Sequence, residues 1–433
     1  MKEKKNIIIS VPHAMHARNL FSSSFDLKGV GLILGNFSND VKKSLTKSTS
    51  CDIKNFNFLN YYQSKIITLY SILLDRKKND DKNGLIKLIK KNYNNCDLEF
   101  KKSFKHKLDN FSNKILFTIA DLLFLKTFTK YFIIISSLII YFHIIIQYKP
   151  KKILFMCTNT SIDKGLFFLA RFFKIKTYGL INSWDHISSK KFIDIKKFDK
   201  LFIWNDYFKK ELKNIHDFDL KKVRTVGLPH YDSEKKKYKK NNLITFFLPS
   251  KIMMHQKKQY EIIEFLYNYC KINKLKLYIK PHPGEEYRDL KKFNKNKIIT
   301  IIIPKAISMN LNTTIHSVNF IDNELGMIIQ KSKVVINFHS TTSLDSIFHL
   351  TPVICLMLEK KNRWFYKWPY YKYILKFNAL VCVHNFIELK NSLNKFLENK
   401  NYKKKEISNL KKIYFGNFNP SSGKKMSEII YND

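Results

Sequence analysis

The feature that most constrains the fold is the stretch Val334–Leu358, which reads VVINFHSTTSLDSIFHLTPVICLML. Val334–Phe338 has the apolar, β-branched composition of a buried strand, and Val353–Leu358 has a similar composition. Between them, a polar turn leads into a helical segment, Leu344–Leu350, with Asp345 in its first turn, where the helix dipole favours an acid. A strand, a turn, a helix and a second strand form a βαβ unit, and such units build parallel sheets.

The turn in this unit contains four hydroxyl side chains, those of Ser340, Thr341, Thr342 and Ser343. Hydroxyl groups next to the free backbone N–H groups of a helix start can hold a diphosphate without any arginine. The alternative is that these residues only cap the helix. We interpret them as a binding site for the phosphates of a nucleotide, because a second motif points to the same edge of the sheet.

The second motif is KPHP, residues 280–283, which ends the strand-like run Leu275–Lys280. Its two prolines stiffen the backbone, so Lys280 and His282 are expected to stay at the strand tip. Alone, His282 would be an ordinary turn residue. Together with the hydroxyl-rich turn, the motif favours a nucleotide-phosphate pocket.

Strand-like and helix-like segments alternate along both halves of the chain. Further strands are expected at Asn6–Val11, Gly29–Gly35, Ile153–Cys157, Thr177–Ile181, Lys200–Trp204, Val223–Val226, Leu243–Leu248 and Ile298–Ile303. This alternation predicts an α/β fold with two Rossmann-like, doubly wound domains that face a cleft. We place the N-terminal domain at 1–235 and the C-terminal domain at 236–415, with 416–433 crossing back to the first domain.

Composition limits the choice of partners and compartment. The formal charge of +43, from 78 Lys and Arg against 35 Asp and Glu, comes mostly from lysines that are scattered along the chain. Arginine and interleaved glycine, which are usual in RNA-binding patches, are scarce here. We therefore expect an anionic membrane surface or a phosphorylated substrate as the partner, and no nucleic acid. The six cysteines lack metal-ligand spacing, and we expect Cys157, Cys355 and Cys382 to be buried thiols of a cytoplasmic protein.

The most apolar segment, Tyr131–Tyr148, is long enough to be considered as a membrane span. Its polar residues Ser136, His143 and Gln147 fall on one helical stripe, at spacings of seven and four. A narrow polar stripe suits a helix that packs on a sheet or lies in a membrane interface better than a lone span. We therefore expect this segment to be buried or interfacial.

Several motifs, in this order, resemble the GT-B-type glycosyltransferases of bacterial surface-polysaccharide synthesis, above all the branch related to CDP-glycerol glycerophosphotransferases. The motifs are Pro12–Asn19 (PHAMHARN), Ser183–Lys191 (SWDHISSKK), Val226–Asp232 (VGLPHYD), Lys280–Pro283 (KPHP) and Ser340–Ile354 (STTSLDSIFHLTPVI). The chain departs from these relatives in two places. In the segment after Trp184, relatives often have Asp-Asn and then Lys-Gly, where this chain has Asp185-His186 and Lys190-Lys191. Before the hydroxyl turn, glycerophosphotransferases tend to have Asp-Tyr, where this chain has Phe338-His339.

The resemblance implies an enzyme that uses a nucleotide-activated sugar as co-substrate, needs no cofactor or metal, and extends a cell-surface polysaccharide, such as capsule or lipopolysaccharide, or a lipid-linked glycan. It implies a cytoplasmic protein at the inner face of the membrane. The donor would be held by the C-terminal domain and the glycan or lipid-linked acceptor by the N-terminal one. The candidate donor-binding residues are Lys280, His282, Ser340, Thr341, Thr342 and Ser343, the candidate acceptor-binding residues are Arg18, Trp184 and Lys190, and the candidate general bases are Asp185, His186 and His13.

Three other functions stay open. A polyol-phosphate transferase on the same fold would release CMP, and a sugar-nucleotide 2-epimerase would need a fuller set of carboxylates. The third alternative is a non-catalytic protein that binds the membrane surface. The one Asp-x-Asp sequence, Asp217-Phe218-Asp219, lies between a helix and a strand, and we interpret it as a surface turn.

Overall fold

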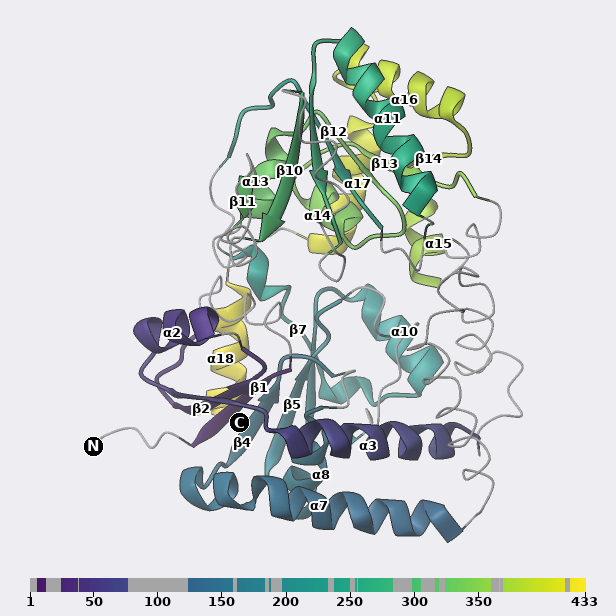
Figure 1. Cartoon of the computed structure of the whole chain (residues 1–433). Coiled ribbons are helices and arrows are strands. Elements are labelled where there is room, and N and C mark those ends of the chain that lie inside the picture. Colours follow the sequence, from purple (N-terminus) through teal and green to yellow (C-terminus); the bar gives the residue numbers. More distant parts are fainter. Residues whose placement is uncertain are drawn as a thin grey trace. The chain divides into compact units, whose positions relative to one another are not determined.

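The computed structural model of the chain describes residues 6–12, 25–37, 39–76, 124–158, 162–183, 187, 197–232, 237–249, 254, 256–282, 298–304, 316–318, 324–359, 366, 369–416 and 421–433. These residues form two compact units (Figure 1). Unit 1 contains the described residues up to Asp232 and again from Ser421, and unit 2 contains those from Lys237 to Gly416. The last helix of the chain therefore belongs to the same unit as its first strand.

Unit 1 is built on a seven-stranded sheet with the order β3-β2-β1-β4-β5-β6-β7, and all neighbouring strands are parallel. The strands are β1 (Ile7–Val11), β2 (Val30–Gly35), β3 (Asp52–Asn55), β4 (Lys152–Phe155), β5 (Lys176–Leu180), β6 (Lys200–Ile203) and β7 (Val223–Thr225). The order runs outward from β1 in both directions, so the topological switch point lies between β1 and β4. Doubly wound sheets bind ligands at the carboxyl ends of the strands at such a point.

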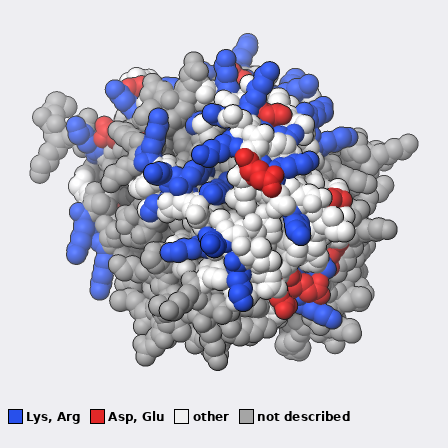
Figure 2. Space-filling model, turned by 90° about the horizontal axis from the view of Figure 1, so that it is seen from above, with Lys and Arg blue, Asp and Glu red and all other residues white. Residues whose placement is uncertain are grey.

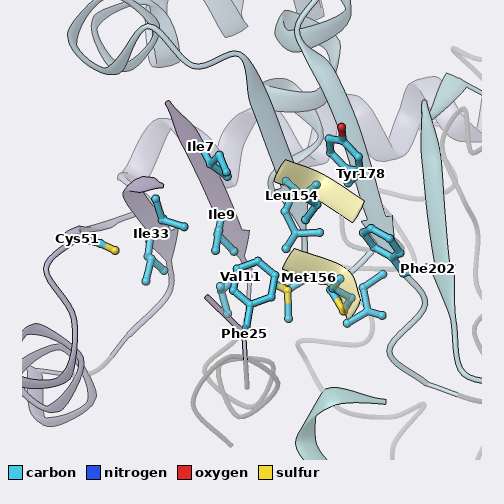
Figure 3. Packing of buried hydrophobic residues seen from close by; sticks show 14 of the residues in the cluster. Ile7, Ile9, Val11, Phe25, Ile33, Cys51, Leu154, Met156, Tyr178 and Phe202 are labelled. Carbon is cyan, nitrogen blue, oxygen red and sulfur yellow. The ribbon is translucent and has the colours of Figure 1, made fainter. Parts of the chain in front are cut away.

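One face of this sheet is covered by α2 (Asn39–Ser48) and α18 (Ser422–Asn432). Alternate residues of the strands point to this face, as the two-residue repeat of a strand requires. Figure 3 shows part of the resulting core, in which the labelled residues are Ile7, Ile9, Val11, Phe25, Ile33, Cys51, Leu154, Met156, Tyr178 and Phe202. From α18, Met426 and Ile430 complete this cluster, and both are fully buried.

Polar contacts hold α18 at both of its ends. The buried carboxylate of Asp232 caps the start of the helix, because it accepts hydrogen bonds from two successive backbone N–H groups there (3.1 and 2.8 Å). At the other end, the Tyr178 hydroxyl donates to Asp433 Oδ2 (2.7 Å), and Lys200 forms an ion pair with the same carboxylate (2.8 Å). The aspartate that ends the VGLPHYD motif thus has a structural role in unit 1.

The opposite face of the sheet carries α8 (Lys164–Phe172), and α3 (Phe58–Arg76) and α7 (Phe124–Tyr148) pack against α8 and against each other. Figure 1 shows α3 and α7 running side by side. Gln63 joins these helices, since its amide group donates hydrogen bonds to the Ser136 and Ser137 hydroxyls of α7 (2.8 and 2.7 Å). One side of α7 is buried in unit 1. The interpretation of Tyr131–Tyr148 as a buried or interfacial helix, and not a membrane span, stays a prediction.

Unit 2 contains a second seven-stranded parallel sheet, with the order β11-β10-β9-β8-β12-β13-β14. Its strands are β8 (Leu243–Phe247), β9 (Lys276–Lys280), β10 (Ile299–Pro304), β11 (His316–Val318), β12 (Val334–Asn337), β13 (Val353–Leu356) and β14 (Leu380–Val383). Its helices are α11 (Gln256–Ile272), α13 (Glu324–Lys331), α14 (Thr342–Phe348), α15 (Pro369–Leu375), α16 (Phe386–Glu398) and α17 (Lys404–Phe415). The switch point lies between β8 and β12, and the prediction of two doubly wound α/β domains is confirmed.

Candidate functional site

The candidate site is the turn between β12 and α14, at the carboxyl edge of the sheet in unit 2. β12 ends at Asn337, and residues 338–341 lead directly into the helix. We expected the helix to begin at Leu344, but it begins at Thr342, so two of the four hydroxyl residues lie in its first turn. The turn follows a strand that borders the switch point, which is where this type of sheet binds ligands.

The four hydroxyl side chains of the turn differ in their contacts. Ser340 Oγ accepts hydrogen bonds from the backbone N–H of Thr342 (3.2 Å) and from its hydroxyl (2.9 Å). Thr341 is the N-cap residue, yet its side chain makes no capping hydrogen bond and is exposed. Ser343 is fully buried. Ser340 therefore stabilises the start of the helix, Thr341 presents its hydroxyl to the surface, and Ser343 faces the interior.

A buried polar cluster behind the turn fixes the end of β12 against α14. The amide group of Asn337 donates hydrogen bonds to the hydroxyls of Thr342 (3.1 Å) and Ser343 (3.0 Å). Tyr371 of α15 is also fully buried, with its hydroxyl 3.2 Å from Cys355 Sγ and 3.4 Å from Ser343 Oγ. Our sequence-based site did not include Asn337 or Tyr371. Asn337 had a visible signal, since it is the polar residue that ends an apolar run.

His339 gives the turn its sharp change of direction. Its backbone lies in the left-handed region (φ 42°), which costs a non-glycine residue about 1–2 kcal/mol. Its ring stacks on that of Tyr371, with centroids 5.2 Å apart and planes inclined by 20°. Its backbone N–H also donates to the Tyr366 hydroxyl (3.3 Å). These aromatic contacts hold His339 in the conformation that the connection from strand to helix requires.

Lys280 lies at the same edge of the same sheet. In the strand register, Ile279 of β9 pairs with Phe246 of β8, and Phe246 pairs with Ile336 of β12. Lys280 and Asn337 are each one residue further along, so β9 and β12 end at the same level, with β8 between them. The spacing of neighbouring strands places these two strand ends about 10 Å apart. The structure therefore brings the two predicted motifs to one edge of the sheet.

The two basic side chains of the KPHP motif are placed differently. Lys280 is buried, with its Nζ 3.4 Å from the carbonyl oxygen of Pro281, to which it donates. His282 is exposed. A buried ammonium interacts more strongly with an anion than an exposed one does, because less water screens the interaction. Lys280 is therefore the stronger candidate of the two for binding a phosphate.

The net charge of the protein does not locate the site. Figure 2 shows many lysine and arginine side chains scattered among uncharged residues on one face of the described part of the chain, with acidic side chains in the minority. Among the described residues, no group of three or more His, Cys, Asp or Glu side chains is arranged to hold a metal ion. Asp217 and Asp219 are exposed, at the end of α10 (Tyr207–His216) and the start of the next short helix, which confirms the prediction of a surface turn.

The predicted residues of the N-terminal domain follow two strands of the sheet in unit 1. In the sequence, His13 and Arg18 follow β1, and Trp184, Asp185, His186 and Lys190 follow β5. All six lie outside the described residues, so their roles stay predictions. Since β1 borders the switch point of this sheet, a ligand is expected at its carboxyl end, and His13 and Arg18 follow that end in the sequence.

At this edge of unit 1 the structure shows polar residues that our sequence-based site did not include. Ser10 of β1 donates a hydrogen bond to Asp163 Oδ2 (2.9 Å), and both side chains are fully buried. Lys164 is buried beside them, and its Nζ donates to the carbonyl oxygen of Thr158 (2.6 Å). The available signal was an adjacent acid and base directly before the helix that we expected at Gly165–Phe173. A carboxylate and an ammonium thus lie next to the switch point.

Glu211 of α10 has a perturbed pKa. Burial raises its pKa to about 7 from an ordinary 4.5, and the opposing hydrogen bond from the Tyr207 hydroxyl (3.2 Å) is too weak to restore it. Between pH 4.5 and about 7 the folded protein therefore keeps a proton that the unfolded chain releases. As a result, Glu211 lowers the stability of the fold as the pH rises through this window.

Replacing Glu211 by glutamine should remove this pH dependence. We expect Glu211→Gln to raise the free energy of unfolding at pH 8 by up to about 3 kcal/mol, and to change it little at pH 4.5, where the wild-type side chain is already neutral in the folded state. Urea unfolding of both proteins at the two pH values measures the effect. An equal change at both values would show that the titration of Glu211 does not cause it.

Neither a protein-family model nor a curated protein matches the chain. Solved structures do: MnaA of S. aureus with UDP (11% identity, TM-score 0.58, covering 99% of this chain and 96% of that one), the UDP-GlcNAc 2-epimerase of Neisseria meningitidis bound to UDP-GlcNAc (11%, 0.55, 99% and 100%), and the glycotransferase of kitacinnamycin (8%, 0.52, 99% and 98%).

At such low identities these likenesses establish the fold alone. The two parallel-sheet α/β units match the GT-B fold that these epimerases and glycosyltransferases share. The coarser part of the resemblance noted in the sequence, to proteins of GT-B type, is thus confirmed at the level of the fold. These structures give no support to the branch of the CDP-glycerol glycerophosphotransferases.

Proposed function

We propose that the protein is a glycosyltransferase that moves a sugar from a nucleotide-activated donor to a glycan or lipid-linked acceptor of a cell-surface polysaccharide. The observation that carries the proposal is the position of the β12–α14 turn, which borders the switch point of its sheet and lies level with Lys280. Two structures with this fold contain UDP or UDP-GlcNAc. A nucleoside diphosphate of this kind is therefore the ligand that we expect here.

In this proposal the residues of unit 2 stabilise the leaving group. When the bond between the sugar and the diphosphate breaks, negative charge grows on the diphosphate. Fixed cations and hydroxyl dipoles near the departing oxygen stabilise that charge without having to reorganise. Lys280 supplies the cation, and Ser340 and Thr341 supply hydroxyls near the surface. His282, in the KPHP motif with Lys280, is a further candidate for contacting the diphosphate. The transfer then needs no metal ion to neutralise the diphosphate.

The acceptor is assigned to unit 1. A general base takes the proton from the acceptor hydroxyl, the hydroxyl oxygen forms a bond to the anomeric carbon of the sugar, and the nucleoside diphosphate leaves. Asp185, His186 and His13 are the candidates for this base. Arg18, Trp184 and Lys190 are the candidates for holding the acceptor, with the indole ring of Trp184 suited to stacking on a sugar. An acceptor attached to a lipid would place the reaction at the inner face of the cytoplasmic membrane.

A 2-epimerase acting on a sugar nucleotide is the second candidate function. Enzymes of this activity are among the structures with the same fold. Epimerisation needs acid and base groups around the sugar, and our sequence reading found too few carboxylates for it. Asp163 supports this candidate, because it adds a buried carboxylate at the edge of unit 1 next to the switch point.

Two further alternative functions can be distinguished from a sugar transferase by the nucleotide that binds and by the product that is released. A polyol-phosphate transferase would take a CDP-activated donor and release CMP. Its relatives tend to have Asp-Tyr before the hydroxyl turn, whereas the strained and aromatically packed His339 occupies the second of these positions here. A non-catalytic protein of the membrane surface would bind a nucleotide weakly or not at all.

The test is the melting temperature of the purified protein with UDP, GDP, ADP, CMP or CDP, followed by analysis of the products. A ligand that binds only the folded protein raises its melting temperature. We expect UDP or GDP to do so, and the matching sugar nucleotide to release its diphosphate only with an acceptor. Stabilisation by CMP or CDP would favour the polyol-phosphate transferase, and formation of the C2 epimer without an acceptor would favour the epimerase. A lack of any shift would favour the binding protein.

A further inference from the structure

The outer side of α7 has a continuous apolar surface. Its exposed side chains recur every three or four residues, so they lie along one stripe of the helix. These residues, which we call the α7 patch, are Phe128, Tyr131, Phe132, Ile135, Ile139, Phe142 and Ile146, and between 41% and 71% of each side chain is exposed. The opposite stripe, with Ile133 and Tyr141, is buried against unit 1. An exposed apolar stripe of this length marks an interaction surface.

The charges around the α7 patch indicate what it binds. The whole helix, 124–148, contains no acidic residue. Exposed lysines lie at both ends of the patch, with Lys130 near its start and Lys149 and Lys151 directly after the helix. Apolar side chains between lysines suit the surface of an anionic bilayer, because the apolar groups enter the acyl boundary while the ammonium groups reach the lipid phosphates. A second copy of this chain fits less well, since each copy carries a formal charge of +43.

The inner side of α7 shows how the helix would meet the bilayer. By length and composition alone, Phe128–Tyr148 could cross a membrane, and it is the one such helix among the described residues. However, its Ser136 and Ser137 hydroxyls accept hydrogen bonds from Gln63, and its Tyr141 hydroxyl accepts one from Asn60. A membrane-spanning α7 would lose these contacts and uncover α8. The packing therefore favours a helix that lies in the plane of the interface.

We propose that the α7 patch docks unit 1 on an anionic phospholipid surface, with the axis of α7 parallel to the bilayer and its inner side still packed on α3 and α8. Figure 1 shows α7 running beside α3 as the outermost helix at this end of unit 1. The inference rests on the exposed side chains and the flanking lysines, and it is independent of whether the protein is a transferase, an epimerase or a binding protein.

The test is flotation of the full chain with vesicles of phosphatidylcholine containing phosphatidylglycerol, and with vesicles of phosphatidylcholine alone. The variant Ile135→Glu with Ile139→Glu places two charges in the middle of the patch. The matched control is Ile272→Glu with Ile387→Glu, which changes the net charge equally at two isoleucines of unit 2 that are 80% and 74% exposed. All four sites are exposed, so both variants should keep the wild-type melting temperature.

We expect the wild type and the control to float with the anionic vesicles, and the α7 variant to lose at least about tenfold in partitioning. Binding should also weaken severalfold when the salt is raised or the anionic lipid is left out. Equal binding by all three proteins would overturn the proposal, because charge alone would then suffice. So would a wild type that fails to float, or one that forms a dimer which the α7 variant dissociates, since another protein surface would then cover the patch.

Discussion

Deleting residues 421–433 is expected to unfold unit 1 and to leave unit 2 folded. The deletion removes the fully buried Met426 and Ile430 from the core of the first sheet, and the loss of one such side chain costs about 2–5 kcal/mol. It also leaves the buried carboxylate of Asp232 without the N–H groups that it caps, at a cost of about 1–3 kcal/mol. Together these losses approach the whole stability of a typical domain.

Urea unfolding followed by far-UV circular dichroism and by hydrogen exchange measures this effect. The wild type should show protection in both sheets, and the deletion variant only in β8–β14. Single substitutions test the same contacts separately. Met426→Ala should lower the free energy of unfolding of unit 1 by about 3 kcal/mol, and Asp232→Ala should lower it by about 2 kcal/mol. The matched control is Asp219→Ala, which removes an exposed capping aspartate and should cost less than about 1 kcal/mol. Normal protection of β1 in the deletion variant would contradict the prediction.

Replacing Lys280 and Ser340 together by alanine is expected to weaken the binding of the nucleotide donor by about 100-fold or more. The change removes the buried cation at the end of β9 and the hydroxyl that orders the start of α14. Charge-assisted contacts to phosphate oxygens are the strongest that such a site can offer, and in a site with little water their loss is weakly compensated. The affinities of the wild type and the double variant are compared by titration calorimetry, with the nucleotide that raises the melting temperature most.

The matched control for this variant is Lys276→Ala, which removes an exposed lysine from the other end of the same strand. It should leave the affinity for the nucleotide within about twofold of the wild type, because a surface charge at that distance is largely screened by salt. If the double variant binds as tightly as the wild type, the assignment of the site is wrong, even though the protein binds a nucleotide. If the control is also weakened, the charge of the whole surface and not the site governs binding.

The central strands of both sheets could be predicted from sequence because they are buried on both faces. β1, β4, β8 and β12 each give a short, nearly continuous apolar run, and our boundaries for them were within a few residues of those observed. We missed β3, β11 and β14, and all three are edge strands. The side chains of β3 read Asp-Ile-Lys-Asn, with only the isoleucine buried, so this strand has no apolar run to detect.

The geometry of the candidate site could be predicted only where one short segment supplies its residues. The hydroxyl-rich turn and the KPHP motif each follow an apolar run, and the parallel sheet then places the ends of their strands at one edge. The support behind the turn was not predictable, because Tyr371 lies 28 residues beyond Ser343, and its contact with that hydroxyl depends on how α15 packs. The pair formed by Ser10 and Asp163 was hidden for the same reason, since 153 residues separate the two.

The return of α18 to unit 1 has a consequence for the order in which the protein folds during synthesis. The helix that completes the first hydrophobic core is translated after all of unit 2, so the ribosome makes β1 roughly 420 residues before the partner that covers one of its faces. At typical elongation rates of about 5–20 residues per second, that face waits for some tens of seconds. Unit 2, whose segments are contiguous in the described chain, can fold first. Unit 1, although it is begun first, therefore exposes apolar surface for the longest time during synthesis.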